Sequence, residues 1–384
     1  MAAMQRSQDD FQIREVLATN HKARKIFLDL PFLIYRNTPQ WVPPLAMDAR
    51  RIFERKGNPF FENGVAAFFL AVGKDGVPLG RIAALHNRSY NAFNQEKSAF
   101  FYLFECVDDT KVSTALFERA IEWVRGQGME RMIGPKGFST LDGMGLLVKG
   151  FEHRPAFGLP YNPPYYIRLV EAAGFTPAGE TVSGYLNPNK MELPEKVRRV
   201  ADLIEQRRGM RVVRFSSKRE LIKMIPRLQE LYNGALEGTS GNIPLTAEDL
   251  RSLADQLMWF ADPRLIKIIL KGEEMAGFLL AYPDISAAVQ RCKGQVFPFG
   301  WIDLLVEMKR TRWVNINGAA MVEKYRGLGG TALLFREMYD SIREGGFEHA
   351  DLVQIGTDNE RMLLELRGLG IDFYKTHRMY EREI

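Results

Sequence analysis

The sequence predicts an α+β protein of two domains, and three observations lead to this prediction. The chain has 384 residues, and because one hydrophobic core seldom supports so many, two domains of about 150–200 residues are expected. Hydrophobic residues make up 46% and charged residues 26% of the chain, which is typical of globular proteins and argues against a disordered chain. Both halves have one order of predicted elements, namely hairpin, strand, helix, strand, helix and closing strand.

The first half, residues 1–187, begins with an expected helix and continues with a segment rich in proline and aromatic residues up to residue 64. Apolar runs between turn residues then predict strands, at 67–72, 80–85, 98–107, 131–134 and 180–186. Asp108, Asp109 and Thr110 are typical N-cap residues, and apolar side chains follow them at helical spacing. A third helix is expected over 165–173.

The second half, residues 195–384, repeats this order. It follows the segment 187–195, which is rich in proline and asparagine and is expected to be a linker. Strands are expected at 210–215, 265–270, 275–282, 312–322, 350–355 and 373–382. Helices are expected at 218–236, 247–260, 331–343 and 360–367. The two halves have no obvious sequence similarity, so the repeat is one of pattern only.

Charge and cysteine content argue against several classes of function. The net charge is +5 and the charges are interspersed, whereas nucleic-acid binding needs clustered basic residues, so no nucleic-acid partner is expected. Cys106 and Cys292 lie in different halves and the histidines are scattered, so neither a disulfide nor a metal is expected, in keeping with the cytoplasm. No run of about 18 apolar residues predicts a membrane-spanning helix, which leaves a peripheral membrane contact open.

One strand, turn and helix in the second half carry the strongest sign of chemistry. Apolar and polar residues alternate over 313–317, which predicts a half-buried strand, and Gly318 then indicates a bulge. A glycine-rich turn follows at 324–330, where Lys324 and Arg326 add positive charge. The free amides and the dipole at a helix N-terminus attract anions, and glycines let the backbone approach a pyrophosphate closely.

This block resembles motif A of the GNAT superfamily of acyl-coenzyme A N-acyltransferases. The motif reads Gln/Arg-x-x-Gly-x-Gly/Ala, and its anchor positions are Arg326, Gly329 and Thr331, the last in place of the usual Gly or Ala. The resemblance implies two GNAT domains in tandem, each a mixed, mainly antiparallel sheet flanked by helices. It also implies an acyl-coenzyme A site in the second half, with contacts expected from Ala320, Met321, Val322, Arg326, Gly327, Leu328, Gly329, Gly330, Thr331 and Asn359.

A second coenzyme-binding motif of the superfamily is similar to Asn359 and the helix that leads to Gly370. In that motif a tyrosine that protonates the departing thiolate often stands about four residues before the glycine, and here the position is Leu366. The resemblance therefore implies that another residue acts as the acid, and Tyr374 or Tyr380 is expected to replace it.

The acceptor end of the reaction is expected on the same strand. Asn315, together with Asn317, is expected to steer the amine. A backbone amide near Met321 or Val322 would stabilise the tetrahedral oxyanion, because preorganised donors are most effective where charge develops.

A narrower resemblance covers nearly the whole chain. Phrases such as Trp-Val-Pro-Pro-Leu and Tyr-Lys-Thr-His-Arg-Met-Tyr-Glu are similar to those of the YghO-like bacterial family of double-GNAT proteins, and they begin at Trp41, Asn58, Gly80, Gly134, Tyr161, Gly277 and Tyr374. Bacterial ceramide synthases are similar two-domain acyltransferases, which adds long-chain acyl groups to the expected substrates.

The corresponding turn in the first half has a different character. It begins at Glu105 and reads Glu-Cys-Val-Asp-Asp-Thr, so it has no glycine, and its carboxylates would repel a pyrophosphate. We expect a degenerate GNAT-like domain there, with a structural or acceptor-binding role. The nearby loop 134–145 carries Lys136 and Asp142 among glycines, and it either lines a substrate cleft or forms a surface loop.

Three functions remain open at this point. The first is an N-acyltransferase that takes acetyl-coenzyme A or a longer acyl-coenzyme A as co-substrate and acylates a small-molecule or lipid amine by direct transfer, without a metal. The second is a non-catalytic GNAT-fold binding or sensor protein, which Thr331 and Leu366 favour. The third is an aminoacyl or long-chain acyl transferase. The expected oligomeric state is a monomer or a homodimer.

Overall fold

The structure is a computed structural model that describes residues 10–56, 58–139, 142–236, 244–246, 248 and 260–384. Contacts between α-carbons divide the chain into two compact units, each of which is described by itself. Unit 1 contains Met1–Thr181, Ser286–Asp303 and Lys375–Ile384, and unit 2 contains Val182–Ile285 and Leu304–Tyr374. The expected linker 187–195 therefore belongs to unit 2.

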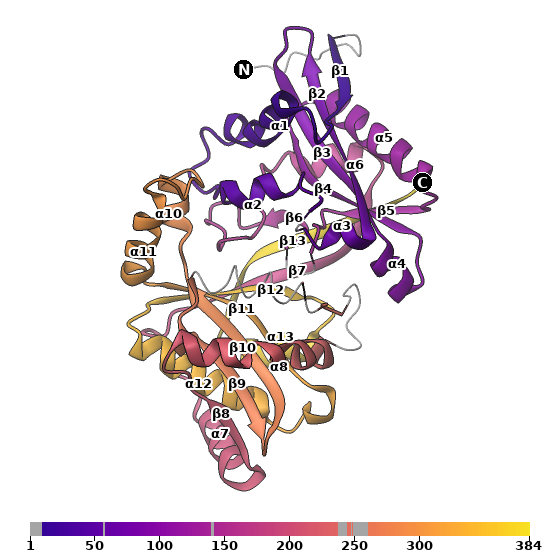
Figure 1. The fold of residues 1–384 in the computed structure, drawn as a ribbon. Coiled ribbons are helices and arrows are strands. Elements are labelled where there is room, and N and C mark those ends of the chain that lie inside the picture. The colour runs from indigo at the N-terminus through magenta and orange to yellow at the C-terminus, as the bar shows by residue number, and fades with distance from the viewer. Residues whose placement is uncertain (1–9, 57, 140–141, 237–243, 247, 249–259) are drawn as a thin grey trace. The chain divides into compact units, whose positions relative to one another are not determined.

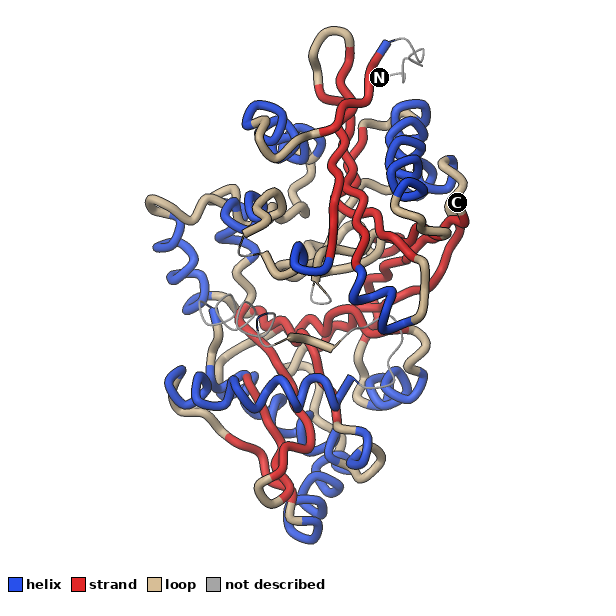
Figure 2. Tube along the Cα trace, turned by 45° about the vertical axis from the view of Figure 1, so that its right-hand side comes forward, coloured by secondary structure: helices blue, strands red, loops and turns tan. Residues whose placement is uncertain are grey.

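Unit 1 is built on a mixed sheet, whose strands are β1 (Phe11–Glu15), β2 (Gly64–Gly73), β3 (Pro78–Asn87), β4 (Ser98–Cys106), β5 (Arg131–Gly134), β6 (Leu146–Lys149) and the end of β13 (Asp372–Glu383). The strands β1 to β5 follow one another in order, and β13 pairs with β5 and β6. The pair β4 and β5 is parallel, whereas the pairs from β1 to β4 are antiparallel. The long hairpin of β2 and β3 stands out in Figure 2.

The helices of unit 1 are α1 (His21–Ile34), α2 (Ala46–Arg51), α3 (Phe60–Asn63), α4 (Arg88–Asn94), α5 (Thr110–Gly126), α6 (Tyr166–Ala172) and α10 (Ser286–Arg291). Helix α5 packs on β2 and β3 (Figure 1). It buries Leu116, Ala120 and Val124, because residues four apart lie on one face of a helix. Segment 286–303 joins this unit through Gln290, whose side chain donates hydrogen bonds of 2.8 Å to the carbonyls of Pro39 and Trp41.

Unit 2 has its own mixed sheet, whose strands are β8 (Met210–Val213), β9 (Ile266–Lys271), β10 (Glu274–Pro283), β11 (Trp313–Met321), β12 (His349–Gly356) and the end of β7 (Thr176–Leu186). The order is β7-β12-β11-β10-β9-β8. The strands β8 to β11 pair in antiparallel fashion, and β11 and β12 are parallel.

The helices of unit 2 are α7 (Glu195–Arg208), α8 (Lys218–Leu236), α12 (Gly330–Glu344) and α13 (Glu360–Gly368), with the 3-10 turns η2 (Pro263–Leu265) and η3 (Glu323–Tyr325). Helix α11 (Gly300–Arg310) has residues in both units. Helix α12 packs between α7 and the sheet, and its side chains Leu333, Leu334 and Met338 belong to the core of the unit.

The two units repeat one succession of elements. In unit 1, the hairpin β2–β3 is followed by β4, α5, β5 and α6, and in unit 2 the hairpin β9–β10 is followed by β11, α12, β12 and α13. In both, the helix joins the two parallel strands. In both, the strand before this helix pairs with the hairpin in antiparallel fashion, as β3–β4 and β10–β11, and the register of that pair shifts near its middle. These findings confirm the predicted α+β fold with its repeated pattern.

Several local predictions need correction or lie outside the described residues. Residues 11–15 form strand β1, paired with β2, where a helix was expected, because the alternating Phe-Gln-Ile-Arg-Glu sequence lies along the edge of the sheet. Helix α1 begins only at His21, after Asn20 accepts a capping hydrogen bond. The helix expected over 247–260 lies almost entirely outside the described residues. Helices α7 and α11 were not predicted.

Burial of one histidine in unit 1 predicts a dependence of stability on pH. His377 is 1% exposed, and its Nε2 atom lies 3.1 Å from the carbonyl of Pro160. Burial, with a contribution from Lys375, lowers the pKa of His377 to about 4. Protons therefore bind the unfolded state preferentially between pH 6.5 and 4, and the free energy of unfolding should fall by up to about 3 kcal/mol across that window.

Urea unfolding at pH 7 and pH 4.5 measures this effect. The variant His377→Asn is expected to lose most of the difference between the two pH values. The exposed His21, changed to Asn, provides the matched control and should retain the difference. An equal loss of stability in the wild type and in His377→Asn would contradict the assignment.

Candidate active site

Strands β11 and β12 of unit 2 separate part of the way along their length. Their parallel ladder joins Trp313–Ile316 to His349–Leu352, and both strands then continue, to Met321 and Gly356. Beyond Ile316, β11 also bulges, because Asn317 and Gly318 together oppose the one residue Leu280 of β10. Gly318 has a φ of +145°, which suits glycine. The far half of β11 therefore pairs with β10 on one side and diverges from β12 on the other.

Where β11 diverges from β12, its backbone amides point alternately toward β10 and toward the side that β12 has left. The amide of Val322 donates to the carbonyl of Ala276 at 2.9 Å, so it points to β10 and is already engaged. Since amides along an antiparallel strand alternate in direction, the amide of Met321 points to the side that β12 has left. Of the two amides expected near an oxyanion, that of Val322 is thus engaged with β10, and that of Met321 faces the side that β12 has left.

The glycine-rich turn after β11 leads directly into helix α12. Gly327 and Gly329 have φ values of +78° and +90°, a region that other residues adopt only with strain. Gly329 is the N-cap of α12, and no side chain caps this helix. Because the first amides of a helix have no partner within it, the start of α12 offers donors and a positive dipole end to an anion.

Arginines from three elements reach this turn. Arg326 donates from Nε to the carbonyl of Met321 at 3.2 Å, and Arg208, the last residue of α7, donates from Nη1 to the carbonyl of Leu328 at 3.0 Å. A Cβ atom added to Gly327 would lie 3.6 Å from Nη1 of Arg361 on α13. Three guanidinium groups thus lie at the turn that precedes α12, where phosphate oxygens could accept their hydrogen bonds. Of these, Arg361 also forms an ion pair with Glu365 at 3.2 Å on its own helix.

Lys324 does not add to this positive charge as expected. It forms an ion pair with Glu274, and that carboxylate also accepts a hydrogen bond from the Tyr325 hydroxyl at 2.5 Å. Hydrogen bonding to Glu274 raises the pKa of Lys324. The lysine charge is therefore compensated on β10, and the arginines are the basic groups of the turn.

Helix α5, which corresponds to α12 in unit 1, has a closed N-terminus. The side chain of Asp109 accepts hydrogen bonds from the amides of Lys111 at 2.9 Å and Val112 at 3.4 Å. A carboxylate of the chain itself thus occupies the place that α12 leaves open to an anion. This agrees with the expectation that the turn at 105–110 does not bind a pyrophosphate.

A row of polar side chains crosses the sheet of unit 2 where β11 and β12 are still paired. Tyr282 on β10 is opposite Asn315 on β11, and Asn315 is opposite Asp351 on β12, so the three side chains share one face. Asn315 donates from Nδ2 to Oδ1 of Asp284 at 3.0 Å. Asn315, Asp284 and Asp351 are each at most 3% exposed.

Two tyrosine hydroxyls complete this polar row. Burial raises the pKa of Tyr374, and a hydrogen bond with the nearby Asp351 carboxylate raises it further. Burial also raises the pKa of Tyr282, with contributions from the charges of Asp284 and Asp351. Both phenols therefore stay protonated at neutral pH, beside two buried carboxyl groups.

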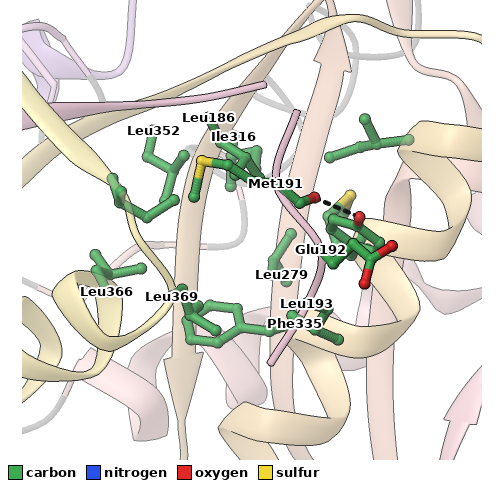
Figure 3. A pocket seen from close by; sticks show the side chains of 14 residues that line it. Leu186, Met191, Glu192, Leu193, Leu279, Ile316, Phe335, Leu352, Leu366 and Leu369 are labelled. Atoms are coloured by element: carbon green, nitrogen blue, oxygen red, sulfur yellow. Dashed lines mark hydrogen bonds between the residues drawn. The ribbon is translucent and has the colours of Figure 1, made fainter. Parts of the chain in front are cut away.

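The opposite face of the same strands borders an apolar cavity of about 50 Å³ (Figure 3). Its walls are apolar apart from Glu192 and the hydroxyl of Tyr339, and the lining residues are Leu186, Met191, Glu192, Leu193, Leu279, Ile316, Phe335, Met338, Tyr339, Ile342, Leu352, Leu366, Leu369 and Ile371. Ile316 and Leu352, the last pair of the β11–β12 ladder, lie in this wall. The cavity therefore begins where the strands separate.

The segment between β7 and α7 covers one side of this cavity. The Tyr339 hydroxyl of α12 donates to the carbonyl of Met191 at 2.6 Å and also lies 3.1 Å from that of Pro188. Figure 3 shows Met191, Glu192 and Leu193 lying along the cavity beside Phe335 and Leu279. The expected linker is thus part of the wall.

The structure divides the residues expected to act in catalysis. Asn315 and Tyr374 belong to the polar row of unit 2. Tyr380 lies in unit 1, where it is fully buried in the core and its hydroxyl is 3.3 Å from Oε1 of Glu171. Of the two tyrosines expected to act as the acid, only Tyr374 therefore lies in the same unit as Asn315.

The residues expected to contact a coenzyme follow the end of β11, the turn and the start of α12, except Asn359, which stands before α13. Ala320 pairs with Phe278 of β10, and Gly330 and Thr331 are the first residues of α12. Asn359 caps α13 by accepting from the amide of Met362 at 3.2 Å. Leu366, which stands where the superfamily often has a tyrosine, lines the apolar cavity.

Sequence reasoning missed Arg208, Arg361, Asp351 and Tyr282. The two arginines reach the turn from helices whose packing cannot be read from spacing. Asp351 did carry a sign, because a carboxylate within the apolar run Ala-Asp-Leu-Val of a strand is costly unless it is used. Among the described residues, no group of three or more His, Cys, Asp or Glu side chains could hold a metal ion.

Known proteins are similar to this chain in sequence or in fold over nearly its full length. No protein-family model matches. The chain is 25% identical over 378 residues to protein YghO of Escherichia coli (strain K12), covering 95% of this chain and 94% of that protein. It is 27% identical over 373 residues to the bacterial ceramide synthase of Caulobacter vibrioides, covering 94% of each.

Among solved structures, a tandem GNAT protein from the clavulanic acid biosynthesis pathway matches with a TM-score of 0.56 and 13% identity, over 97% of this chain and 98% of that one. At such low identity the likeness concerns the fold alone. It agrees with the two repeated units. The chain is thus a homologue of protein YghO and of the bacterial ceramide synthase, built on the tandem GNAT fold.

Proposed function

We propose that this protein transfers an acyl group from acyl-coenzyme A to an amine, with both substrates meeting in unit 2. The observation that carries the proposal is the contrast between the two corresponding helices. Helix α12 begins at an uncapped glycine beside three arginines, whereas α5 is closed by Asp109. Such an open helix end is an anion site, and the coenzyme A pyrophosphate is the anion that a GNAT fold would place there.

The coenzyme would extend from this end along β11. The amides of Gly330 and Thr331, with Arg208, Arg326 and Arg361, would hold its phosphates. About 20 Å of strand separates Met321 from Asn315, at the usual rise per residue. The pantetheine arm has a comparable extended length, so the thioester would lie where β11 and β12 begin to diverge, close to the polar row.

The reaction would be direct transfer. The amine nitrogen attacks the thioester carbonyl carbon, and a backbone amide of β11 at its bulge beside Ile316 would stabilise the resulting oxyanion. The Asp351 carboxylate accepts the proton that the amine nitrogen loses, and the hydrogen bond with Tyr374 holds that carboxylate in place. The carbon–sulfur bond then breaks, and the proton held by Asp351 passes to the thiolate, which leaves as free coenzyme A and restores the carboxylate. The buried carboxylates of Asp284 and Asp351 would also attract a cationic amine before the reaction.

The apolar cavity indicates which acyl groups are used. Each methylene buried against its walls would contribute about 0.8 kcal/mol, so a fatty acyl group would bind better than acetyl. The homologous bacterial ceramide synthase supports this, since a ceramide is the N-acyl derivative of a long-chain amino alcohol. The cavity holds about 50 Å³, room for about two water-sized groups, so a fatty chain would enter by displacing the segment 187–193.

Release of free thiol from acetyl-, octanoyl- and palmitoyl-coenzyme A, with a long-chain amino alcohol as acceptor, tests this proposal. We expect thiol release with the fatty thioesters, at least tenfold faster than with acetyl-coenzyme A, and an N-acyl product by mass spectrometry. Leu366→Trp should fill the cavity and remove the preference for long chains, while Leu364→Trp, at an exposed position on the same helix, should keep it.

Two results would contradict the proposal in different ways. Thiol release that is fastest with acetyl-coenzyme A would reject the role of the cavity but retain acyl transfer. No release with any thioester, over a range of primary amines, would reject acyl transfer and favour the non-catalytic binding protein.

A further inference from the structure

Segment 297–306 exposes an unusual amount of apolar side chain. Phe297, Phe299 and Trp301 are 60%, 74% and 40% exposed, and Ile302, Leu305 and Val306 are 45%, 47% and 37% exposed. These six large side chains fall within ten residues, at the start of helix α11 and just before it. A cluster of exposed apolar side chains on a protein surface marks an interaction site.

The exposed face of helix α11 is mostly apolar, whereas the exposed face of a helix in water is usually polar. Its exposed positions are Trp301, Ile302, Leu305, Val306, Lys309 and Arg310, whereas Asp303 and Glu307 are partly buried. Asp303 accepts two hydrogen bonds from Arg291, at 2.8 and 2.9 Å. A helix in contact with water would place its acidic residues outward and its apolar residues inward. Here the outward face is apolar and basic, and Asp303, whose side chain is 34% exposed, is neutralised by its ion pair with Arg291.

We propose that the 297–306 surface docks this protein onto an anionic lipid bilayer. Aromatic and aliphatic side chains with Lys and Arg on the same face are the composition of helices that lie in the bilayer interface. Lys293, Lys309 and Arg310 are exposed around the apolar cluster and would meet the anionic headgroups. Tryptophan is favoured at this depth of the membrane.

The contact would be peripheral and would not span the bilayer. Among the described residues, no helix is long and apolar enough to cross a membrane. Docking of α11 along the interface needs only its exposed face to enter the headgroup region.

The charge on this face favours a bilayer over a second copy of the chain. A two-fold contact would pair this patch with itself, so Lys309 and Arg310 of each copy would face the same apolar and basic patch of the other. The partly exposed carboxylate of Asp303 is already paired with Arg291 and so does not compensate them. An anionic lipid surface supplies the missing negative charge over the whole face.

Sedimentation with vesicles tests the inference without reference to acyl transfer. The full chain is expected to bind vesicles of phosphatidylcholine with one third phosphatidylglycerol, and to bind phosphatidylcholine alone much more weakly. Changing both Phe299 and Trp301 to Ser should weaken binding about tenfold or more, through the lost apolar contact. Changing Lys309 and Arg310 to Gln should weaken it about fivefold for each residue and reduce its sensitivity to salt.

Phe93→Ser provides the matched control, because Phe93 is an aromatic residue that is 59% exposed on a different helix. It should leave vesicle binding unchanged. Unaltered thermal unfolding of all variants would exclude misfolding as the cause. The inference is overturned if the wild type does not sediment with anionic vesicles, or if the Phe299 and Trp301 changes only convert a dimer in solution to a monomer.

Discussion

Replacing Thr331 by Glu is expected to weaken acyl-coenzyme A binding about 30-fold while leaving the fold intact. Thr331 is the second residue of α12, so a carboxylate there would face the phosphates across a few ångströms. Repulsion between partly screened charges at that distance is worth roughly 2 kcal/mol. The same carboxylate interacts favourably with the dipole of its own helix, by about 0.3–1 kcal/mol. Binding and stability should therefore change in opposite directions.

Titration calorimetry with a coenzyme A thioester, together with a thermal unfolding midpoint, measures both effects. Thr331→Gln is the matched control, because it has nearly the same size without the charge, and its affinity should stay within about threefold of the wild type. If Glu and Gln lowered the affinity equally, the effect would be steric. If neither changed it, the phosphates would not lie at the start of α12.

The second large effect is expected from Asp351→Asn. The turnover number should fall about 100-fold or more, because the amide cannot accept the proton of the amine. The affinity for the acyl-coenzyme A should hardly change, since the carboxylate lies at the acceptor end of β11 and the arginines at the other. Tyr374→Phe should give a smaller loss, as expected of a residue that positions the carboxylate.

Steady-state kinetics with separate variation of the two substrates tests this assignment. Asp372→Asn, at an exposed aspartate in the same unit, should leave the rate unchanged. Raising the pH should partly restore the rate of Asp351→Asn, because free amine then replaces ammonium without help from the protein. A variant that turns over at the wild-type rate, or that fails only in coenzyme binding, would remove Asp351 from the chemistry.

Much of the fold could be predicted because local patterns and tertiary packing agree. Helix α8 has the predicted bounds, and strands β4 and β12 lie within one or two residues of them. The repeat between the halves was visible although their sequences differ. Backbone pairing and the placement of apolar faces define the succession of elements, and these need only residue classes.

Strand β1 and helices α7 and α11 could not be predicted with the same evidence. The Phe-Gln-Ile-Arg-Glu segment becomes a strand because β2 offers it an edge, and that partner lies more than fifty residues away. The apolar side of α11 points outward, so its pattern alone does not say which face is buried. For these elements, the secondary structure and the buried face depend on the neighbouring elements more than on the local sequence.

The sequence predicted the anion-binding part of the candidate site but only part of its polar row. The glycine-rich turn has a local motif, and its helix end follows from Gly329 and Gly330. The polar row depends on the register that puts Tyr282, Asn315 and Asp351 side by side, and register cannot be read from one strand. The same holds for Arg208 and Arg361, which reach the turn from other elements.

The number of acyl-coenzyme A molecules bound per chain tests the central claim most directly. Calorimetric titration of the wild type is expected to give one site per chain, which Thr331→Glu weakens and Thr331→Gln retains. A single site would agree with an open end at α12 and a closed end at α5. Two equivalent sites per chain, or no binding of any thioester, would contradict it.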